Sequence, residues 1–423
     1  MKIAEFAEYF NLTTESRAFV EKYGFDEVAD RLETVPDTLQ RDFILCELGT
    51  LRRPPASGEL LEAAEMIKND RFLLAYYNYL CYYWWQLPEP MTYGNKLPEV
   101  SDNPGCDEIE GKLYLLAALA GFDAVRRSYA GMGLPPEYAE DTLQYVAGAV
   151  EEYQAGHDGK IGLVSGKLRW MRHYVNRHLF RIGRLEYMVQ DPVAWLPAVY
   201  KRNSDGKVIA LCRNGWNLSQ DGLLLFADEF SFDAYVTAKL EQTSDTISGI
   251  PIDPRGFAEV DRRVTLKLNE YTPLWNMWDL VPGIHIPGGG GMKRSAVEDS
   301  LRRARDFFPR YLKREVAGFS CISWIFNPDF ETELPNSNLA DFMREVYLFP
   351  FKSVGVEGLQ FVFGKSDKDW SDYPADNSLR LAFHRIREAG KRLKCGGMFI
   401  DRQTIDRFGS QPYRSDYAAF DEL

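Results

Sequence analysis

The segment between residues 283 and 298 constrains the fold of this chain more than any other. Helix N-termini present backbone N–H groups and the positive end of the helix dipole to an anion, and glycine lets a ligand approach the backbone closely. In order, the segment contains the apolar run Gly283–Pro287, the glycines Gly288, Gly289, Gly290 and Gly291, and then Met292, Lys293, Arg294 and Ser295. It predicts a strand, a glycine loop and a helix that together bind a pyrophosphate-bearing cofactor, with acyl-CoA as the leading candidate.

The helix after the glycines is predicted to span Ser295–Lys313, with Val297, Leu301, Ala304 and Phe308 on one face. Ser295 and Glu298 have the spacing of a capping box, in which the two residues satisfy each other's backbone N–H. Four glycines alone are also typical of a flexible turn. The run lacks the Gly-Lys-Ser/Thr ending of a nucleoside-triphosphate loop, and its place in the chain does not favour a dinucleotide fingerprint. A different phosphorylated ligand remains an alternative.

The length and net charge of the chain limit the classes of protein to which it can belong. A chain of 423 residues predicts two domains, and the net charge of −12 argues against general nucleic-acid binding. Basic residues are concentrated in two segments, Ser165–Arg184, with six Lys/Arg and no acid, and Met292–Arg314, with eight Lys/Arg against three acids. Each segment is either a basic wall facing a polyphosphate or an ordinary solvated helix face.

The sequence lacks the features of secreted, membrane-spanning, disulfide-rich and metal-binding proteins. The N-terminus carries acids where a signal peptide needs an apolar core, and the longest apolar runs are shorter than the ~20 residues that span a bilayer. Six scattered cysteines without a Cys-x-x-Cys pair suit reduced thiols. No metal site is expected, because His173 and His178 do not share a helix face. We therefore expect a cytoplasmic protein with no membrane or nucleic-acid partner.

The pattern of elements predicts an α+β protein with a helical N-terminal domain over residues 1–155 and a mixed-sheet domain with flanking helices over residues 156–423. In the second domain, apolar periodicity predicts a basic helix over Lys167–Phe180. A helix is also expected over Leu339–Glu345, and another over Leu379–Leu393. Predicted strands include Leu185–Val189, Ala198–Lys201, Lys207–Cys212, Val264–Leu268, Ile284–Ile286, Phe319–Phe326, Tyr347–Phe351 and Leu359–Phe363.

This order of elements resembles the second half of the GNAT acyltransferase fold. More specifically, the chain resembles a bacterial family of acyltransferase domain-containing proteins, which have a helical N-terminal domain and a GNAT-like C-terminal domain. The resemblance implies that the loop after one strand grips the CoA pyrophosphate, and that the next strand splays away to admit the pantetheine arm. It rests on His178–Glu186, Ser248–Asp253, Asp279 with His285–Pro287, Ser300–Leu301 with Ala304–Phe308, Cys321 with Ser323–Trp324 and Pro328, Leu334–Pro335 with Ser337–Asn338, and Phe361–Gly364.

Three positions depart from that pattern. Pro282 and Gly283 stand where an apolar strand pair is expected, Ile322 stands where relatives tend to have histidine, and the four-glycine run is richer in glycine than the usual loop. If the missing histidine is catalytic in relatives, this chain is altered or weakened.

Acyl transfer to an amine needs a polarised thioester carbonyl, a base for the amine and a proton for the leaving thiolate. His285 is the first candidate for the base, because the ordinary histidine pKa near ~6.5 suits that role. Asp279 is expected to orient it or to act as the base itself. Ser337 and Asn338 are candidates for a wall of the acceptor site. The alternatives are a structural histidine, a turn aspartate and a helix cap.

These expectations amount to an acyl-CoA-dependent N-acyltransferase that moves an acyl group to an amine of a small molecule or peptide by direct attack. The alternative function is a catalytically inactive GNAT-like protein that binds CoA or another ligand as a sensor or scaffold.

Overall fold

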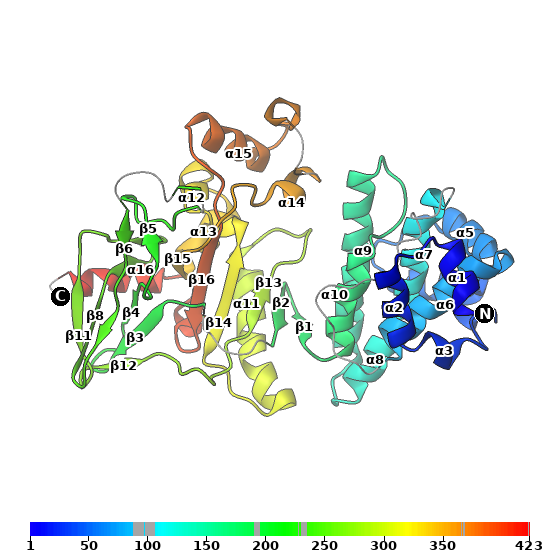
Figure 1. The fold of residues 1–423 in the computed structure, drawn as a ribbon. Coiled ribbons are helices and arrows are strands. Elements are labelled where there is room, and N and C mark those ends of the chain that lie inside the picture. The colour runs from blue at the N-terminus through cyan, green and yellow to red at the C-terminus, as the bar shows by residue number, and fades with distance from the viewer. Residues whose placement is uncertain are drawn as a thin grey trace. The chain divides into compact units, whose positions relative to one another are not determined.

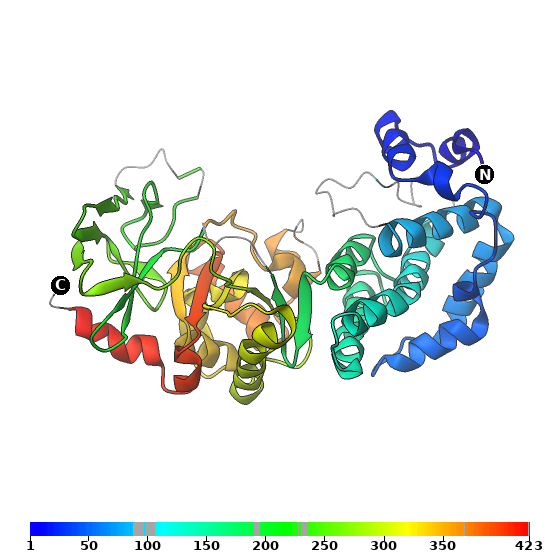
Figure 2. The same ribbon diagram turned by 90° about the horizontal axis from the view of Figure 1, so that it is seen from below.

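The computed structural model describes residues 1–87, 97, 106–189, 195–226, 228–229, 235–364, 366, 369–421 and 423. The chain divides into two compact units, Met1–Arg181 and Ile182–Leu423 (Figures 1 and 2). The domain boundary predicted near residue 155 falls at the end of α9, whereas the first compact unit continues through α10. The assignment of α10 to a functional domain stays a prediction.

The first unit is helical, as the sequence predicted. Its central helix, α6, begins after Asp70, whose carboxylate accepts the backbone N–H groups of Phe72 and Leu73. Ten of its fifteen residues are buried, so its aromatic side chains form core. The helices of this unit are α1 (Ile3–Tyr9), α2 (Thr14–Lys22), α3 (Phe25–Val28), a 3₁₀ turn (Asp37–Leu39), α4 (Arg41–Thr50), α5 (Ser57–Asn69), α6 (Arg71–Trp85), α7 (Asp107–Ala120), α8 (Phe122–Ala130), α9 (Pro136–Gly156) and α10 (Gly166–Val175).

The second unit is built on a six-stranded mixed sheet with the order β1-β2-β13-β14-β16-β15. Within it, β13 and β14 run parallel, while β2, β16 and β15 pair antiparallel with their neighbours. Its strands are β1 (Leu179–Ile182), β2 (Leu185–Met188), β13 (Gly283–His285), β14 (Gly318–Ser323), β15 (Tyr347–Pro350) and β16 (Gly396–Asp401).

A smaller sheet lies beside the β15 edge of the six-stranded sheet (Figure 1). Tyr347 of β15 links the two sheets, because its hydroxyl donates to the carbonyl oxygen of Ile252 and accepts the N–H of Ala210. The order of this sheet is β10-β9-β4-β3-β12. Its strands, with those of two minor sheets, are β3 (Ala198–Arg202), β4 (Val208–Leu211), β5 (Asn217–Leu218), β6 (Val236–Thr237), β7 (Glu241–Gln242), β8 (Thr246–Gly249), β9 (Pro251–Asp253), β10 (Phe257–Ala258), β11 (Val264–Lys267) and β12 (Tyr271–Pro273).

Helix α11 connects β13 to β14 and packs on the face of the six-stranded sheet that carries Tyr187. Its residues Val297, Leu301 and Ala304 are fully buried, and Phe308 follows them, as the predicted apolar face requires. Beyond α11 the chain continues as one π-helical turn. The helices of this unit are α11 (Arg294–Phe307), α12 (Asp329–Glu333), α13 (Asn338–Glu345), α14 (Leu359–Phe363), α15 (Ser378–Glu388) and α16 (Pro412–Tyr417).

Two element predictions were wrong. The run Leu359–Phe363 is the short helix α14, not a strand, because Gly358 and Gly364 bound it with positive φ and a five-residue apolar run has no decisive period. The helix predicted over Lys167–Phe180 ends at Val175, since Arg177 has a φ of 61° and the next residues enter β1.

Candidate active site

The strands β13 and β14 separate where the sequence resemblance implied a gap. They pair at one position within the strands, Gly283 with Ser320. Beyond it, β13 stays paired with β2 as far as His285, and β14 stays paired with β16 as far as Ser323. The C-terminal halves of two parallel neighbours therefore leave a gap between them, with the Gly283–Ser320 pair at its closed end.

The local sequence explains how the closed end is held. An earlier bridge joins Leu280 to Val316. From this bridge to the Gly283–Ser320 pair, the chain advances three residues on the β13 side and four on the β14 side. Such an extra residue bends a strand and changes the direction of pairing. Pro282 has no N–H to donate, but its carbonyl oxygen accepts the N–H of Ser320 at 3.1 Å. The Pro282–Gly283 departure thus lies at the closed end of the gap.

Strand register sorts the side chains onto two faces. Residues two apart on one strand, and residues paired across strands, share a face. Gly283, His285 and Ser320 therefore share a face with Glu186, which pairs with His285. The other face carries Tyr187, whose hydroxyl hydrogen-bonds Ser300 Oγ of α11 at 2.9 Å. The candidate base thus faces away from α11.

Glu186 was not predicted as a site residue. It is directly opposite His285 in the antiparallel register and only 2% exposed. Cβ atoms of such a pair are about 5 Å apart. The sequence contains Glu186 in one of the motifs of the resemblance, but it does not indicate which residue of a distant strand will oppose it.

Asp279 lies in a turn before β13. Its carboxylate accepts the N–H of Asn276 at 2.6 Å, and its own N–H donates to the carbonyl oxygen of Asn276. The tip of this turn exposes Met277 (61%) and Trp278 (80%). Asp279 precedes the strand that ends at His285, so its position fits a turn residue.

Ser337 acts as the N-cap of α13. Its hydroxyl accepts the N–H of Ala340 at 3.0 Å and donates to the carbonyl oxygen of Leu334 at 2.8 Å. Asn338, the first residue of the helix, is exposed. Local capping accounts for Ser337, and a role of either residue in acceptor binding stays a prediction.

The glycine loop has a backbone that favours glycine and an open surface. Gly289, Gly290 and Gly291 have φ values of 69°, 85° and 62°, which side-chain-bearing residues rarely adopt. A Cβ on Gly288 or Gly291 would meet nothing within 4 Å. The loop is anchored by Arg184, whose Nε donates to the carbonyl oxygen of Gly291 at 2.5 Å.

The start of α11 offers backbone donors without a side-chain cap. Lys293 is the N-cap residue, no side chain caps the helix, and its first turn contains no acid. The predicted capping box was therefore wrong: the helix begins one residue before Ser295, and Glu298 instead pairs with Arg302 at 3.0 Å. Lys293 and Arg294 are exposed here. An uncapped helix start beside open glycine backbone and two cations fits a pyrophosphate.

The wider basic segments form less of a wall than their composition suggested. Further along α11 the arginines pair with acids, and in the first segment several cations are engaged locally. The contacts are Arg302 with Glu298 and Asp406, Arg303 with Asp299, Arg305 with Asp406, Lys167 with Glu152, and Arg172 with the carbonyl oxygens of Trp84 and Leu87. The basic character near the loop is therefore confined to a few residues.

Two neighbouring residues of β14 differ in chemistry. Burial raises the pKa of the Cys321 thiol well above its usual range, which makes it a poor nucleophile. Ser320 is completely buried, and its hydroxyl has no hydrogen-bond partner among the described residues. Leaving a buried hydroxyl unsatisfied costs about 1–3 kcal/mol, so such a group needs an explanation.

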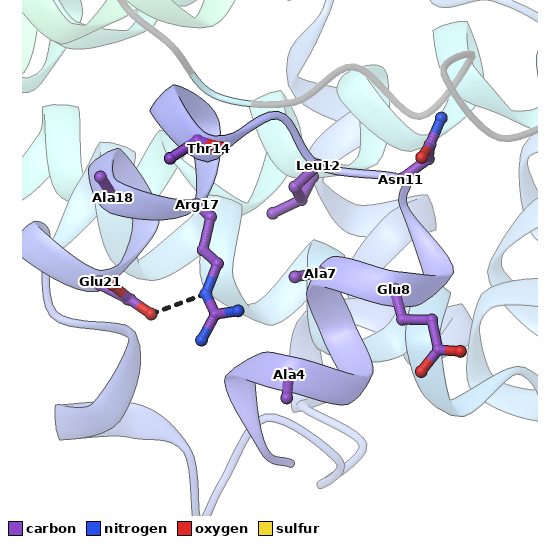
Figure 3. A pocket seen from close by; sticks show the side chains of 9 residues that line it. All are labelled: Ala4, Ala7, Glu8, Asn11, Leu12, Thr14, Arg17, Ala18 and Glu21. Atoms are coloured by element: carbon purple, nitrogen blue, oxygen red, sulfur yellow. Dashed lines mark hydrogen bonds and ion pairs between the residues drawn. The ribbon is translucent and has the colours of Figure 1, made fainter.

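A separate hollow of about 690 Å³ lies in the helical unit, on α1, α2 and the turn between them (Figure 3). Two of its three charged residues form an ion pair, because Arg17 Nε is 2.9 Å from Glu21 Oε1. It lacks the glycine loop and helix start that suit a pyrophosphate, so we do not assign the cofactor to it. It is lined by Ala4, Ala7, Glu8, Asn11, Leu12, Thr14, Arg17, Ala18 and Glu21.

Comparison with known proteins places the chain in a family. Residues 179–399, more than half of the chain, match the family described as GNAT-like C-terminal domain. The chain belongs to this family. No curated protein matches. In the described part of the chain, no helix has the length and apolar character needed to cross a membrane, and no group of His, Cys, Asp and Glu could hold a metal ion.

Solved structures share the fold over nearly the whole chain. One is an acyltransferase in complex with decanoyl-CoA and teicoplanin, with 17% sequence identity and a TM-score of 0.57. Another is a mutant acyltransferase in complex with octanoyl-CoA, with 18% identity and a TM-score of 0.58. Each match covers 95% of this chain and 99% of the other. The chain therefore has the architecture that the sequence predicted, a helical N-terminal region followed by a GNAT-like domain.

Proposed function

We propose that this protein is an acyl-CoA-dependent N-acyltransferase that transfers an acyl group to an amine of a small molecule or peptide. The gap between β13 and β14 carries this proposal, because it ends at the Gly283–Ser320 pair and opens toward the glycine loop and the start of α11. The similar acyltransferases bind decanoyl-CoA and octanoyl-CoA, and one binds teicoplanin, which supports acyl-CoA as the donor.

Each group along this path has a role that its chemistry suits. Backbone N–H groups of Gly288–Gly291 and of the first turn of α11 would bind the pyrophosphate, with the cations of Lys293 and Arg294 beside them. The open strand edges beyond Gly283 would hold the amide groups of the pantetheine arm, as a strand edge holds a peptide.

His285 would remove the proton of the attacking amine. It is the last residue of β13, at the edge of the gap, and it shares a face with the buried Glu186. A carboxyl group beside a histidine can accept a hydrogen bond from one ring nitrogen and so orient the other toward the substrate. The attack needs no covalent enzyme intermediate, which agrees with the buried, protonated Cys321.

Variants of this pair test the proposal. His285→Ala should lower turnover of octanoyl-CoA with an accepted amine by about 10²–10⁴, while the dissociation constant for octanoyl-CoA changes less than about threefold. Glu186→Gln should lower turnover by a smaller factor. Turnover is followed as thiol release, across a panel of small amines and peptides. Equal turnover of His285→Ala and wild type would remove His285 from the mechanism.

Ile322 favours one alternative, a protein that binds CoA without turnover. Because Gly283 pairs with Ser320, His285 and Ile322 lie opposite each other across the gap, each two residues further along its strand. The histidine that relatives tend to have at position 322 would therefore face His285. Stabilisation of the protein by acyl-CoA with no thiol release across the whole amine panel would establish this sensor or scaffold function.

A further inference from the structure

Ser320 occupies the closed end of the gap with a hydroxyl that the fold does not use. Its side chain is completely buried, and its Oγ has no hydrogen-bond partner among the described residues. An unsatisfied buried hydroxyl destabilises the folded state, so stability does not explain its presence. A ligand that enters the gap can supply the missing partner.

The residues paired with Ser320 offer its hydroxyl no polar side chain. In the sheet it is paired with Gly283 of β13 and with Phe399 of β16. Gly283 has no side chain, and the Phe399 ring is stacked on Tyr347 at 4.7 Å and meets Trp275 edge-on at 5.2 Å. The hydroxyl therefore lies between an aromatic cluster and a bare stretch of β13.

The position matches one part of the donor substrate. A pantetheine arm that follows the gap inward from the glycine loop ends in its thioester, and the last paired position it reaches is Gly283–Ser320. His285 is two residues from Gly283 and on the same face, so the base for the amine and the hydroxyl beside the thioester would lie on the same side of the sheet.

We propose, resting on the function proposed above, that Ser320 Oγ donates a hydrogen bond to the thioester sulfur and stabilises it as the leaving thiolate. The amine nitrogen forms a bond to the carbonyl carbon and the carbon–sulfur bond breaks, with its electron pair staying on sulfur. His285 takes the amine proton, and that proton later neutralises the thiolate. Ser320 keeps its own proton throughout, because its role is to stabilise negative charge on sulfur.

The test compares two buried serines. Ser300 is also completely buried, but its hydroxyl is satisfied by Tyr187 and by the backbone of β1 and β2. Ser300→Ala should lower the melting temperature. Ser320→Ala removes an unsatisfied group and should leave the melting temperature unchanged or raise it. Ser320→Cys, which replaces the hydroxyl by a slightly larger and weaker donor, serves as a second variant.

The decisive readout is a pair of dissociation constants, for CoA and for desulfo-CoA, measured by calorimetry at pH 9.5. At this pH a substantial fraction of an alkyl thiol is ionised. Wild type and Ser300→Ala should bind CoA about tenfold more tightly than desulfo-CoA, because a hydrogen bond to a charged group is strong. Ser320→Ala should bind the two equally.

Each outcome separates this inference from the proposed function. A preference for CoA that persists in Ser320→Ala, or a melting temperature that falls as in Ser300→Ala, overturns the role of Ser320 while leaving the acyl-CoA site in place. Failure of wild type to bind either compound overturns the acyl-CoA proposal, and the role of Ser320 with it.

Discussion

At the scale of single residues, the buried carboxylate of Glu186 is the feature that most changes the view of His285. A buried charge is costly unless it is paired, and the register places His285 directly opposite. This register links a residue of β2 to one ninety-nine positions later in the chain, and it places a carboxyl group beside the candidate base.

His173 of α10 gives a prediction for pH. Burial, together with the nearby charges of His178 and Arg169, lowers the pKa of His173 to about 4. The unfolded chain takes up the proton below about 6.5, whereas the folded chain stays neutral until about 4. The stability contributed by neutral His173 is therefore complete above pH 6.5 and is lost as the pH falls toward 4.

Urea unfolding of wild type and His173→Gln between pH 7.5 and 4 measures this effect. The stability of wild type should fall more steeply than that of the variant across that window. His157→Gln is the matched control, because His157 is exposed, and it should follow wild type. Parallel curves for wild type and His173→Gln would show that His173 is not buried as a neutral group.

Some of these residues were recognisable from the sequence and others were not. The glycine run, His285 and the cap at Ser337 stand out because their signals are local: glycine content, a strand end and the spacing of a capping residue. Glu186 and Ser320 acquire their significance from pairing across distant strands, and neither composition nor periodicity specifies register. The capping box at Ser295 failed because the helix starts one residue earlier.

At the scale of elements, α13 separates a structural serine from a functional one. Ser337→Ala should lower the free energy of unfolding by about 1 kcal/mol, because the N–H of Ala340 loses its acceptor. Asn338→Ala, at the next and exposed position, should change it by less than about 0.5 kcal/mol. Denaturant unfolding measures both, and calorimetry should give the same acyl-CoA affinity for each. A Ser337→Ala variant that keeps its stability but turns over more slowly would instead show that Ser337 has a role in the active site.

The elements that could be predicted from the sequence are those with a long or strongly bounded pattern. Strands β13 and β15 and the start of helix α11 were expected within a few residues of their observed positions, because apolar periodicity and glycine or proline punctuation agree there. Helix α14 was missed because five apolar residues suit either a strand or a helix turn. The gap between β13 and β14 was implied only by the family resemblance, since it depends on tertiary pairing.

At the scale of the whole molecule, we place donor binding in the unit Ile182–Leu423. Acyl-CoA should slow hydrogen exchange most strongly at the backbone amides of residues 288–297, because those N–H groups would donate to the pyrophosphate. Exchange mass spectrometry with and without octanoyl-CoA measures this, with α15 (Ser378–Glu388) as an internal reference that should change little. Protection concentrated in Met1–Arg181 would contradict the assignment.

The most direct test is a calorimetric titration with acetyl-CoA and octanoyl-CoA of wild type, Gly290→Trp and Gly133→Trp. Gly133 is the matched control, because it is exposed, has a φ of 73° close to the 85° of Gly290, and leaves open space within 4 Å of where a Cβ would lie. We expect micromolar binding to wild type and Gly133→Trp, and none to Gly290→Trp. Undiminished binding to Gly290→Trp, or no binding to wild type, would contradict an acyl-CoA site at the glycine loop.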